Sequence, residues 1–395
     1  MPINLFGSAI SRMVALRLTR LAKVRKPEFK VRLSDGLVVL PRTADSAIEG
    51  DPGLYSLRFY ERRLHGRAKA TKRSSRNEAS HATIGQIFGD KSGDLLRRDL
   101  ISVETGDLKM ARGAWLSGWL GTTPSHFASD IEIANIESSD GWTLPSWLQR
   151  ATESPSKMSP SETWAIHIHG RGATPAETAR NFQFFNALGF SNLSISYRND
   201  ASALQHGKVN LGPLSLGTSE WKDLEAAVQF AQSSGAKKLL IFAWSYGAAL
   251  CSQFQRYSAL ASSISGYIYD SPVISWRATL AFQVLLAGRP PYWASWGEKF
   301  LANAASARSI GLAEAIHFED FEVSSVARHL HTPMLILHSK DDGFVPFEPV
   351  QELATALPNL VRLQVFVDAR HCRLYNFDRF SYQKAVGDFV KLVLR

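Results

Sequence analysis

One serine, Ser245, lies where an apolar run gives way to a helix-forming run. The run 239–242 has the length and bulk of a buried parallel strand, and the helical pattern begins at Ala248. Ala243 and Gly247 flank the serine in the string AWSYG, and both are small enough for a tight turn in which the backbones of strand and helix nearly touch. A hydroxyl at the apex of such a turn could be a nucleophile, and it could equally be the N-cap of the helix.

Three other polar strings also follow strand-like runs. The turn His169–Gly172 (HGRG), the turn 341–346 (DDGFVP) and His371 each come after an apolar segment. A serine, a histidine, an aspartate and fixed backbone N–H groups are what acyl transfer requires. The glycine-rich turn could instead hold phosphate, but it lacks the Lys-Ser/Thr pair of a P-loop and the third glycine of a dinucleotide fingerprint.

Taken together, these strings resemble those of the α/β-hydrolase family. AWSYG is similar to the nucleophile elbow G-x-S-x-G, with Ala243 in place of the first glycine, and HGRG is similar to the HGxG string of esterases and lipases. The segment His338–Pro346 resembles the family's HGxxDxxVP segment, with Ser339 where glycine is usual. The resemblance covers residues 126–395 and leaves out the first 125.

The resemblance implies a role for each reactive side chain. Ser245 would be the nucleophile, and His371 would take its proton and return it to the leaving group. Alignment on the valine–proline pair makes Asp342, rather than Asp341, the acid that holds the other nitrogen of the imidazole. Asp270, at the end of the strand expected at 265–270, is a competitor for that role, although we favour for it a structural role as a helix cap or in a loop contact.

The resemblance also implies an oxyanion hole made by the backbone N–H groups of Arg171 and Tyr246. Other residues of the same strings could contact the substrate: His169, Gly170, Gly172 and Trp244. Arg198, at the end of the strand expected at 191–197, could bind a substrate carboxylate or pair with Glu220 or Asp223. We favour the pairing.

Strands and helices alternate through the second part of the chain. The alternation at 131–136, the turn at 138–141 and the strand at 142–148 predict a hairpin. The elements expected after it are strand 163–168, helix 174–187, strand 191–197, helix 218–233, strand 238–243, helix 246–260, strand 265–270, strand 333–338, strand 362–367 and a helix from about 379. This order predicts the α/β class, with a mostly parallel central sheet and helices on both faces, as expected for an α/β-hydrolase fold.

The pattern divides the chain into three parts. Residues 1–27 read as a basic amphipathic helix, residues 28–125 as a β-rich extension, and residues 126–395 as the α/β-hydrolase domain. Within the domain, residues 271–330 exceed an ordinary connection and predict a cap insertion. The apolar and aromatic side chains of the cap could favour an acyl or aromatic substrate, or they could pack the cap onto the body.

The extension shows strand patterns but no motif that carries chemistry. Residues 55–60 and 82–88 read as strands, and the basic segment Lys69–Asn77 reads as a loop between them. Residues 108–120 are predicted to form a short helix or an irregular piece. We expect the extension to pack beside the main domain.

Positive charge is concentrated at the start of the chain. The chain carries 45 Lys and Arg against 36 Asp and Glu, a net charge of +9, and residues 1–112 hold 22 of the basic and 12 of the acidic residues. No nucleic-acid partner is expected, because RNP strings, zinc-finger spacing and basic heptads are missing. No apolar run reaches 18 residues, so no transmembrane helix is predicted. Residues 1–26 could lie on a membrane surface or dock on the folded body, and both alternatives stay open.

The two cysteines indicate a reducing compartment, and the spacing of possible metal ligands indicates no metal site. Cys251 and Cys372 suit a reducing compartment; we expect Cys251 to be buried and Cys372, beside His371, to be partly exposed. No spacing is typical of a zinc site, and we expect no metal and no cofactor. The predicted location is cytoplasmic, with membrane association through residues 1–26 left open.

The function predicted from these observations is serine hydrolysis of a carboxylic ester, or a related acyl bond, through an acyl-enzyme intermediate. The substrate would be a small acyl molecule. One alternative is a serine peptidase or amidase, because WSYG also resembles the elbow of the prolyl-oligopeptidase group. Acyl transfer to an alcohol is another, since exclusion of water decides it. A non-catalytic binding module that retains the fold is a third, and the intact Ser, His and Asp set argues against it.

Overall fold

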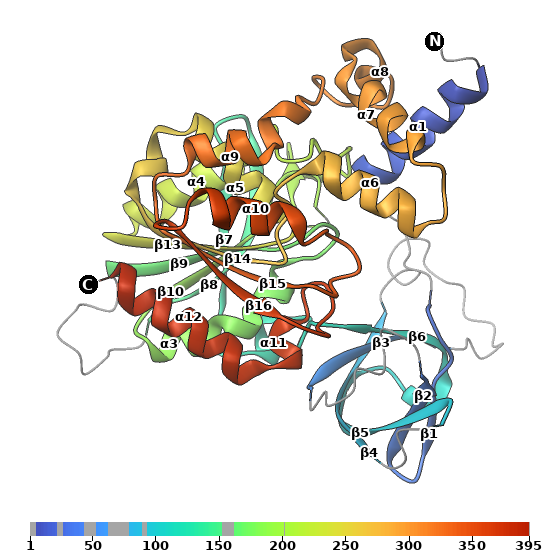
Figure 1. The fold of residues 1–395 in the computed structure, drawn as a ribbon. Helices are drawn as coiled ribbons and strands as arrows, with labels where there is room; N and C mark the ends of the chain where they lie inside the picture. The colour runs from blue at the N-terminus through green and yellow to red at the C-terminus, as the bar shows by residue number, and fades with distance from the viewer. Residues whose placement is uncertain are drawn as a thin grey trace.

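The computed structural model describes residues 5–21, 27–42, 53–61, 79–88, 93–151, 162–200 and 202–394 (Figure 1). The loop Lys69–Asn77, the loop 152–161 and the cations Lys23, Arg25 and Lys26 lie outside the described residues.

The larger of two sheets has ten strands in the order β12-β11-β8-β10-β9-β13-β14-β15-β16, with β7 paired to β8. The pairs from β10 through β9, β13, β14 and β15 to β16 are parallel, whereas β7, β8, β11 and β12 pair antiparallel. The strands are β7 (Glu132–Glu137), β8 (Trp142–Gln149), β9 (Thr163–Ile168), β10 (Ser191–Ile195), β11 (Leu204–Gln205), β12 (Lys208–Val209), β13 (Lys238–Trp244), β14 (Ile264–Asp270), β15 (Met334–Ser339) and β16 (Val361–Phe366). The predicted hairpin and the mostly parallel sheet are both present.

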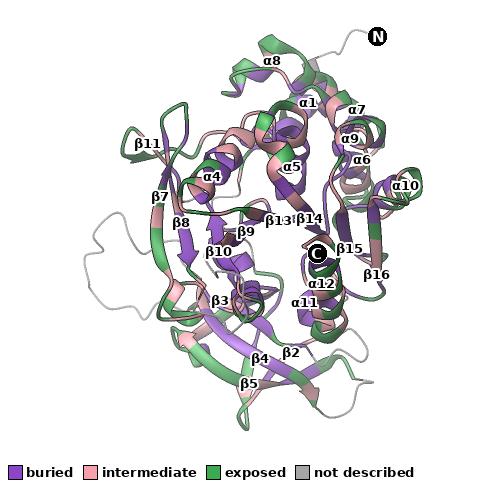
Figure 2. Ribbon diagram, turned by 90° about the vertical axis from the view of Figure 1, so that its left-hand side faces the viewer, coloured by how far each residue is buried: buried purple, intermediate pink, exposed green. Residues whose placement is uncertain are grey.

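Helices cover both faces of this sheet, with α4, α5, α9 and α10 on one side and α3 and α12 on the other (Figure 1). The side chains of the central strands therefore enter two separate cores. Leu239, Ile241 and Ala243 of β13 lie in one apolar cluster, and Leu240, Phe242 and Trp244 lie in the other, as the period-two geometry of a strand requires. Because both faces are covered, β13 is buried from Leu239 onward, which explains its continuous apolar sequence. Figure 2 shows these buried strands between helices with exposed outer faces.

The helices of the domain largely follow the predicted pattern, with one break. The expected helix 174–187 is three short pieces, with a 3₁₀ turn, Ala179–Asn181, between α2 and α3. The side chains of Arg180 and Asn181 are buried in this turn and bond to distant residues. The helices are α2 (Pro175–Thr178), α3 (Phe182–Ala187), α4 (Trp221–Ser233), α5 (Tyr246–Tyr257), α10 (Glu348–Ala356), α11 (Leu374–Phe377) and α12 (Arg379–Val393).

The smaller sheet is antiparallel throughout, in the order β1-β2-β5-β4-β3-β6. Its strands are β1 (Arg32–Ser34), β2 (Leu37–Pro41), β3 (Tyr55–Glu61), β4 (Ser80–Phe88), β5 (Leu95–Thr105) and β6 (Ala111–Ser117). The strands expected at 55–60 and 82–88 are present. The prediction for 108–120 is wrong in its main part: only Leu108–Met110 is helical, as a 3₁₀ turn, and β6 follows it. Ala114 and Leu116 point into the core of this sheet, because β6 pairs with β3.

The segment 271–330 forms mainly helices between β14 and β15. These are α6 (Trp276–Leu286), α7 (Tyr292–Ala302), α8 (Ala304–Ser309), the 3₁₀ turn Phe318–Phe321 and α9 (Val323–His329). The N-terminal helix α1 (Leu5–Thr19) lies against α6 and α7 (Figure 1). Ile10 and Val14 of α1 pack in one cluster with Leu280, Val284 and Ala294. The apolar stripe of α1 is thus docked on the folded body.

Among the described residues, no helix is long and apolar enough to cross a membrane.

Candidate active site

Ser245 occupies a strained turn between β13 and α5. Its backbone has φ 49° and ψ −109°, a left-handed region that residues with a Cβ rarely adopt. The surrounding backbone holds this conformation, since Ser245 N donates to Asp270 O at 2.9 Å and Val273 N donates to Ser245 O at 3.1 Å. Strain of this kind persists only where neighbouring structure fixes it, and it is concentrated at functional sites.

Gly247 lets α5 approach the end of β9. A Cβ at this position would lie 2.8 Å from the carbonyl oxygen of Ile168 and 3.2 Å from that of His169. Both atoms belong to backbone, which cannot move aside as a flexible side chain can. The small residue expected from the sequence is therefore required by the contact between α5 and the strand that leads into the HGRG turn.

We expect Gly247→Ala to lower the free energy of unfolding by about 1–3 kcal/mol, because the added methyl group would push α5 away from β9. Turnover should fall as well, since the shift moves the HGRG turn relative to Ser245. Urea unfolding and ester turnover measure the two effects.

Gly387→Ala is the matched control, because Gly387 lies within α12 and the nearest atom to an added Cβ is Phe184 Cζ at 3.6 Å. It should be neutral or stabilising by up to about 1 kcal/mol. Equal stability of Gly247→Ala and the wild-type protein would contradict the contact described above.

The side chains of Ser245, His371 and Asp342 form a continuous chain of hydrogen bonds. His371 Nε2 lies 2.9 Å from Ser245 Oγ, and His371 Nδ1 lies 2.9 and 2.8 Å from the two carboxylate oxygens of Asp342. An ionised carboxylate can only accept, so the imidazole proton resides on Nδ1 and Nε2 is free to accept from the serine hydroxyl. The three positions come from the loops after β15 and β16 and from the β13–α5 turn, which share one edge of the sheet.

The charges of this trio support one another. Burial would raise the pKa of Asp342, but the attraction of His371 and the hydrogen bonds to the carboxylate keep that pKa below its usual value. Two of these bonds come from backbone, as Phe344 N and Val345 N donate to Asp342 Oδ1 at 2.9 and 2.7 Å. For His371, burial alone would lower the pKa, but the charge and hydrogen bond of Asp342, with smaller effects of Asp270 and Glu177, raise it.

The other two candidate acids have different partners. Asp341 Oδ2 accepts from the backbone N–H of Asp368 at 2.8 Å. Asp270 is fully buried and accepts from Tyr382 Oη at 3.0 Å and from Ser271 Oγ at 2.9 Å. Burial raises the pKa of Asp270, against the effect of nearby Arg180. No direct hydrogen bond between either carboxylate and His371 occurs among the described residues.

Asp270 instead anchors the loop that carries the histidine. Ser271 Oγ accepts from the backbone N–H of Cys372 at 3.1 Å, and Arg180 Nη1 donates to Cys372 O at 3.0 Å. The guanidinium of Arg180 lies 3.7 Å from Asp270 and also donates to Gly118 O at 2.9 Å. The role of Arg180 could not be predicted, because nothing in its neighbourhood in the sequence distinguishes it from a surface residue of a helix. Cys372, expected to be partly exposed, is buried by these contacts.

The HGRG turn passes directly beside Ser245. A Cβ on Gly170 would lie 3.5 Å from Ser245 Cβ. Gly170 N donates to the buried carboxylate of Glu177 at 2.7 Å, and Tyr197 Oη donates to Gly170 O at 3.0 Å. Glu177 thus holds the backbone of the HGRG turn in place through Gly170, a role that could not be predicted from the sequence. Its acidic side chain at the start of a short helix gave no sign of this role.

Two backbone N–H groups were expected near the serine. Tyr246 is the first residue of α5, where the N–H has no partner within the helix. Arg171 directly follows Gly170, so its N–H lies in the turn that borders Ser245. The side chain of Arg171 points to α1, and its Nη2 donates to the backbone oxygens of Arg17 and Arg20 at 2.6 and 2.7 Å. The N-terminal helix is thereby attached to the HGRG turn.

The side chains of His169 and Trp244, expected as substrate contacts, are packed inside the protein. His169 is fully buried, its ring stacks on Tyr197 at 4.4 Å between centroids, and its Nε2 lies 3.1 Å from Asp200. Trp244 is also fully buried and stacks on Phe242 at 4.1 Å. Neither side chain is open to a ligand. For Gly172, a Cβ would lie 3.5 Å from Leu21 Cδ2, so this glycine is next to the segment that follows α1.

Arg198 is held by two carboxylates. Its Nε and Nη2 donate to Asp223 Oδ1 and Oδ2 at 2.7–3.1 Å, and its Nη1 and Nη2 donate to Asp140 at 2.7 and 2.8 Å. The pairing alternative therefore applies, with Asp140 as an additional partner. Glu220 bonds elsewhere, to the backbone N–H groups of Ser215 and Gly217.

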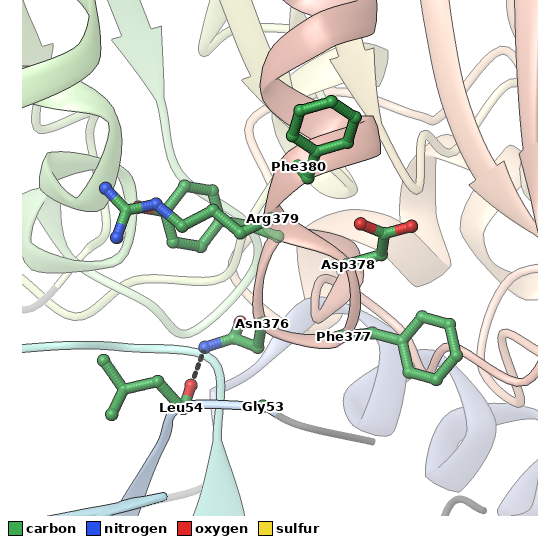
Figure 3. A pocket seen from close by; sticks show the side chains of 8 residues that line it. Gly53, Leu54, Asn376, Phe377, Asp378, Arg379 and Phe380 are labelled. Carbon is green, nitrogen blue, oxygen red and sulfur yellow. Dashed lines mark hydrogen bonds between the residues drawn. The ribbon is translucent and has the colours of Figure 1, made fainter. Parts of the chain in front are cut away.

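A hollow of about 530 Å³ is lined by Gly53, Leu54 and residues 375–380, and so by none of the trio (Figure 3). Asn376 Nδ2 donates across it to Leu54 O at 2.6 Å, which ties the start of β3 to the C-terminal part of the chain. No group of three or more His, Cys, Asp or Glu that could hold a metal ion occurs in the described part of the chain.

Comparison with known proteins supports the fold. No family model matches the chain. The chain is 22% identical over 237 residues to the uncharacterized protein YqkD of Bacillus subtilis (strain 168). The aligned part makes up 57% of this chain and 70% of that protein. Two crystal forms of the Pyrococcus furiosus esterase Pf2001 are similar in structure. The P2₁2₁2₁ form gives a TM-score of 0.52 at 20% identity and covers 70% of this chain and 95% of the esterase. The P2₁ form gives 0.50 at 18% identity, with 70% and 97% covered. Together with the strand order, these likenesses show that the chain has an α/β-hydrolase fold.

Proposed function

We propose that this protein is a serine hydrolase that cleaves a carboxylic ester of a small acyl substrate through an acyl-enzyme intermediate. The observation that carries the proposal is the unbroken chain of hydrogen bonds from Asp342 through His371 to Ser245, with the serine on a strained turn. A strained backbone is typical of functional sites, and an adjacent proton acceptor makes a hydroxyl nucleophilic. An N-cap serine needs neither of them.

In the first half of the reaction, Ser245 Oγ attacks the substrate carbonyl and His371 Nε2 takes the hydroxyl proton. Negative charge develops on the carbonyl oxygen, where the N–H groups of Arg171 and Tyr246 would donate to it. Asp342 stabilises the imidazolium without taking its proton. The C–O bond to the leaving alcohol then breaks, and His371 gives its proton to that alcohol.

In the second half, water replaces the alcohol. His371 removes a proton from the water as it attacks the acyl carbon, and the same two N–H groups stabilise the second oxyanion. The bond between the acyl carbon and Ser245 Oγ breaks, the serine regains a proton from His371, and the carboxylic acid leaves. No cofactor is required by these steps.

The pH dependence of turnover should follow from His371. The imidazole has to be neutral to accept the serine proton, so kcat/KM falls as the pH drops through the pKa of this residue. Since Asp342 raises that pKa against the effect of burial, the acid limb should lie above about 6.5, the value of an unperturbed imidazole. A pH profile of kcat/KM on a p-nitrophenyl ester measures it. An acid limb well below this value would contradict the coupling of the two side chains.

A fluorophosphonate probe tests the proposal directly, because it reacts only with an activated serine. We expect labelling of the wild-type protein and none of Ser245→Ala. A series of p-nitrophenyl esters of increasing chain length, together with peptide anilides, would then separate the reaction classes. Hydrolysis of the esters but not of the anilides supports an esterase; the reverse would favour the peptidase or amidase alternative. Absence of labelling in the wild-type protein would leave a non-catalytic module as the better account.

A further inference from the structure

Large apolar side chains gather at the turn between α6 and α7. Leu285 is 65% exposed, Leu286 is 55% exposed and Tyr292 is 52% exposed. Leu280 and Val284 of the same helix are buried against α1. Single exposed leucines are common on soluble proteins, but here three large hydrophobic residues fall within eight positions, at one side of the molecule (Figure 1).

The helices on either side of this turn, and α1 packed against them, carry more cations than anions. Residues 5–21 contain α1, and residues 280–303 contain the end of α6, the turn and α7. The single acidic residue in these two segments is Glu298. That carboxylate accepts from Arg277 Nε at 2.7 Å, so its charge is neutralised. Exposed cations of the two segments are Arg12, Arg17, Arg20, Arg289 and Lys299. Exposed leucine and tyrosine side chains among unopposed cations are the pattern that binds an anionic lipid surface.

The end of α6 is also linked to His371 through Phe344. Gln283, less than one helical turn before Leu286, donates through Nε2 to the backbone oxygen of Phe344 at 2.5 Å. The ring of Phe344 is 40% exposed and lies 4.9 Å, between centroids, from the imidazole of His371. A surface that contacts the α6–α7 turn would therefore lie near Phe344 and His371.

We propose that the α6–α7 turn docks on an anionic lipid bilayer. Leu285, Leu286 and Tyr292 enter the interface between the headgroups, while Arg289 and the exposed cations of α1 and α7 contact the lipid phosphates. The apolar side chains Ile10 and Val14 of α1 pack against α6 and α7, so they do not face the lipid. In this arrangement α1 contributes charge and the α6–α7 turn contributes the apolar anchor.

Vesicle co-sedimentation tests the proposal without any need for turnover. We expect the full chain to bind vesicles of phosphatidylglycerol mixed with phosphatidylcholine, to bind phosphatidylcholine alone much more weakly, and to lose binding as salt is added. The double variant Leu285→Asp/Leu286→Asp should bind at least about tenfold more weakly, since it removes both apolar anchors and adds repulsion. Arg289→Glu should weaken binding by about fivefold or more.

Matched controls place the same substitutions elsewhere. Leu188, after α3, is 41% exposed, and Lys391 is an exposed cation of α12. Leu188→Asp and Lys391→Glu should bind vesicles as the wild-type protein does. The proposal is overturned if the wild-type chain does not bind the anionic vesicles, or if the double variant binds them equally well. It is also overturned if the double variant converts a dimer into a monomer while vesicle binding is unchanged, because the turn would then be an interface between copies. None of these outcomes bears on hydrolysis, which the fluorophosphonate probe reports separately.

Discussion

Ser245→Ala is expected to lower kcat/KM for a p-nitrophenyl ester by about 10⁶-fold, the loss typical when the nucleophile of an acyl-transfer site is removed. The reason is geometric: Ser245 Oγ is the atom 2.9 Å from His371 Nε2, and alanine leaves the imidazole with no proton to accept. Stability should change little, because alanine at φ 49° bears the same backbone strain as serine.

Ser245→Gly separates the strain from the chemistry. It should lose turnover as completely as the alanine variant, but glycine adopts positive φ without the clash of a Cβ. Relief of about 1–3 kcal/mol of strain is opposed by the larger conformational entropy of glycine in the unfolded chain, about 0.5–1 kcal/mol. We therefore expect Ser245→Gly to unfold at a higher urea concentration than Ser245→Ala.

Ser252→Ala is the control for both variants, because Ser252 lies on the same helix and its Oγ only donates to Ala249 O at 2.8 Å. It should keep fluorophosphonate labelling and turnover. Retention of turnover in Ser245→Ala would show that another residue is the nucleophile. A Ser245→Gly variant less stable than Ser245→Ala would show that the turn is not strained as described.

The elements that carry the trio could be predicted because each is a local pattern. An apolar run followed by a small–x–Ser–x–Gly string specifies strand, turn and helix within a dozen residues, and Gly247 then meets backbone at 2.8 Å as such a turn requires. Parallel strands end at one edge of the sheet, so the residues after β13, β15 and β16 had to be neighbours. The choice of Asp342 over Asp341 came from the resemblance to the α/β-hydrolase family, through alignment on the valine–proline pair.

The supports of the site could not be predicted, because they join residues that are far apart in sequence. Arg180 bonds to Gly118, 62 positions earlier, and to Cys372, 192 positions later. Arg171 bonds to the end of α1, 154 positions earlier. A sequence shows the type of each side chain but not the distant carbonyl oxygen that it reaches, so the contacts of both guanidinium groups could not be predicted.

One wrong prediction and one alternative that stayed open have the same origin. Residues 111–117 form a strand because β3 supplies the partner, although their local sequence favours no element strongly. The amphipathic pattern of α1 shows that one face is apolar, but the pattern is the same whether that face meets lipid or the cap. Only the packing of Val14 against Leu280 and Val284 decides between the two.

Asp342→Asn is expected to lower kcat by about 10⁴-fold while the fold is retained. Asp342 Oδ1 accepts from Phe344 N and Val345 N, so the oxygen of an asparagine would stay at that position and its NH₂ group would face His371. His371 Nδ1 would then have to accept, which places the imidazole proton on Nε2. That tautomer directs an N–H at Ser245 Oγ and cannot take its proton. The pH profile provides a second readout, because loss of the carboxylate lowers the pKa of His371 and moves the acid limb to lower pH.

Asp270→Asn should give the opposite balance of effects. Asp270 holds Ser271 and the buried guanidinium of Arg180, so removal of its charge leaves that cation without its carboxylate and lowers the free energy of unfolding by about 3–5 kcal/mol. The folded fraction should keep kcat within about tenfold of the wild-type value, since Asp342 still orders the imidazole. Urea unfolding and kcat measured on both variants distinguish the two carboxylates. If Asp270→Asn abolishes turnover without a loss of stability while Asp342→Asn remains active, then Asp270 is the acid and the hydrogen bond between Asp342 and His371 is not the one that catalysis uses.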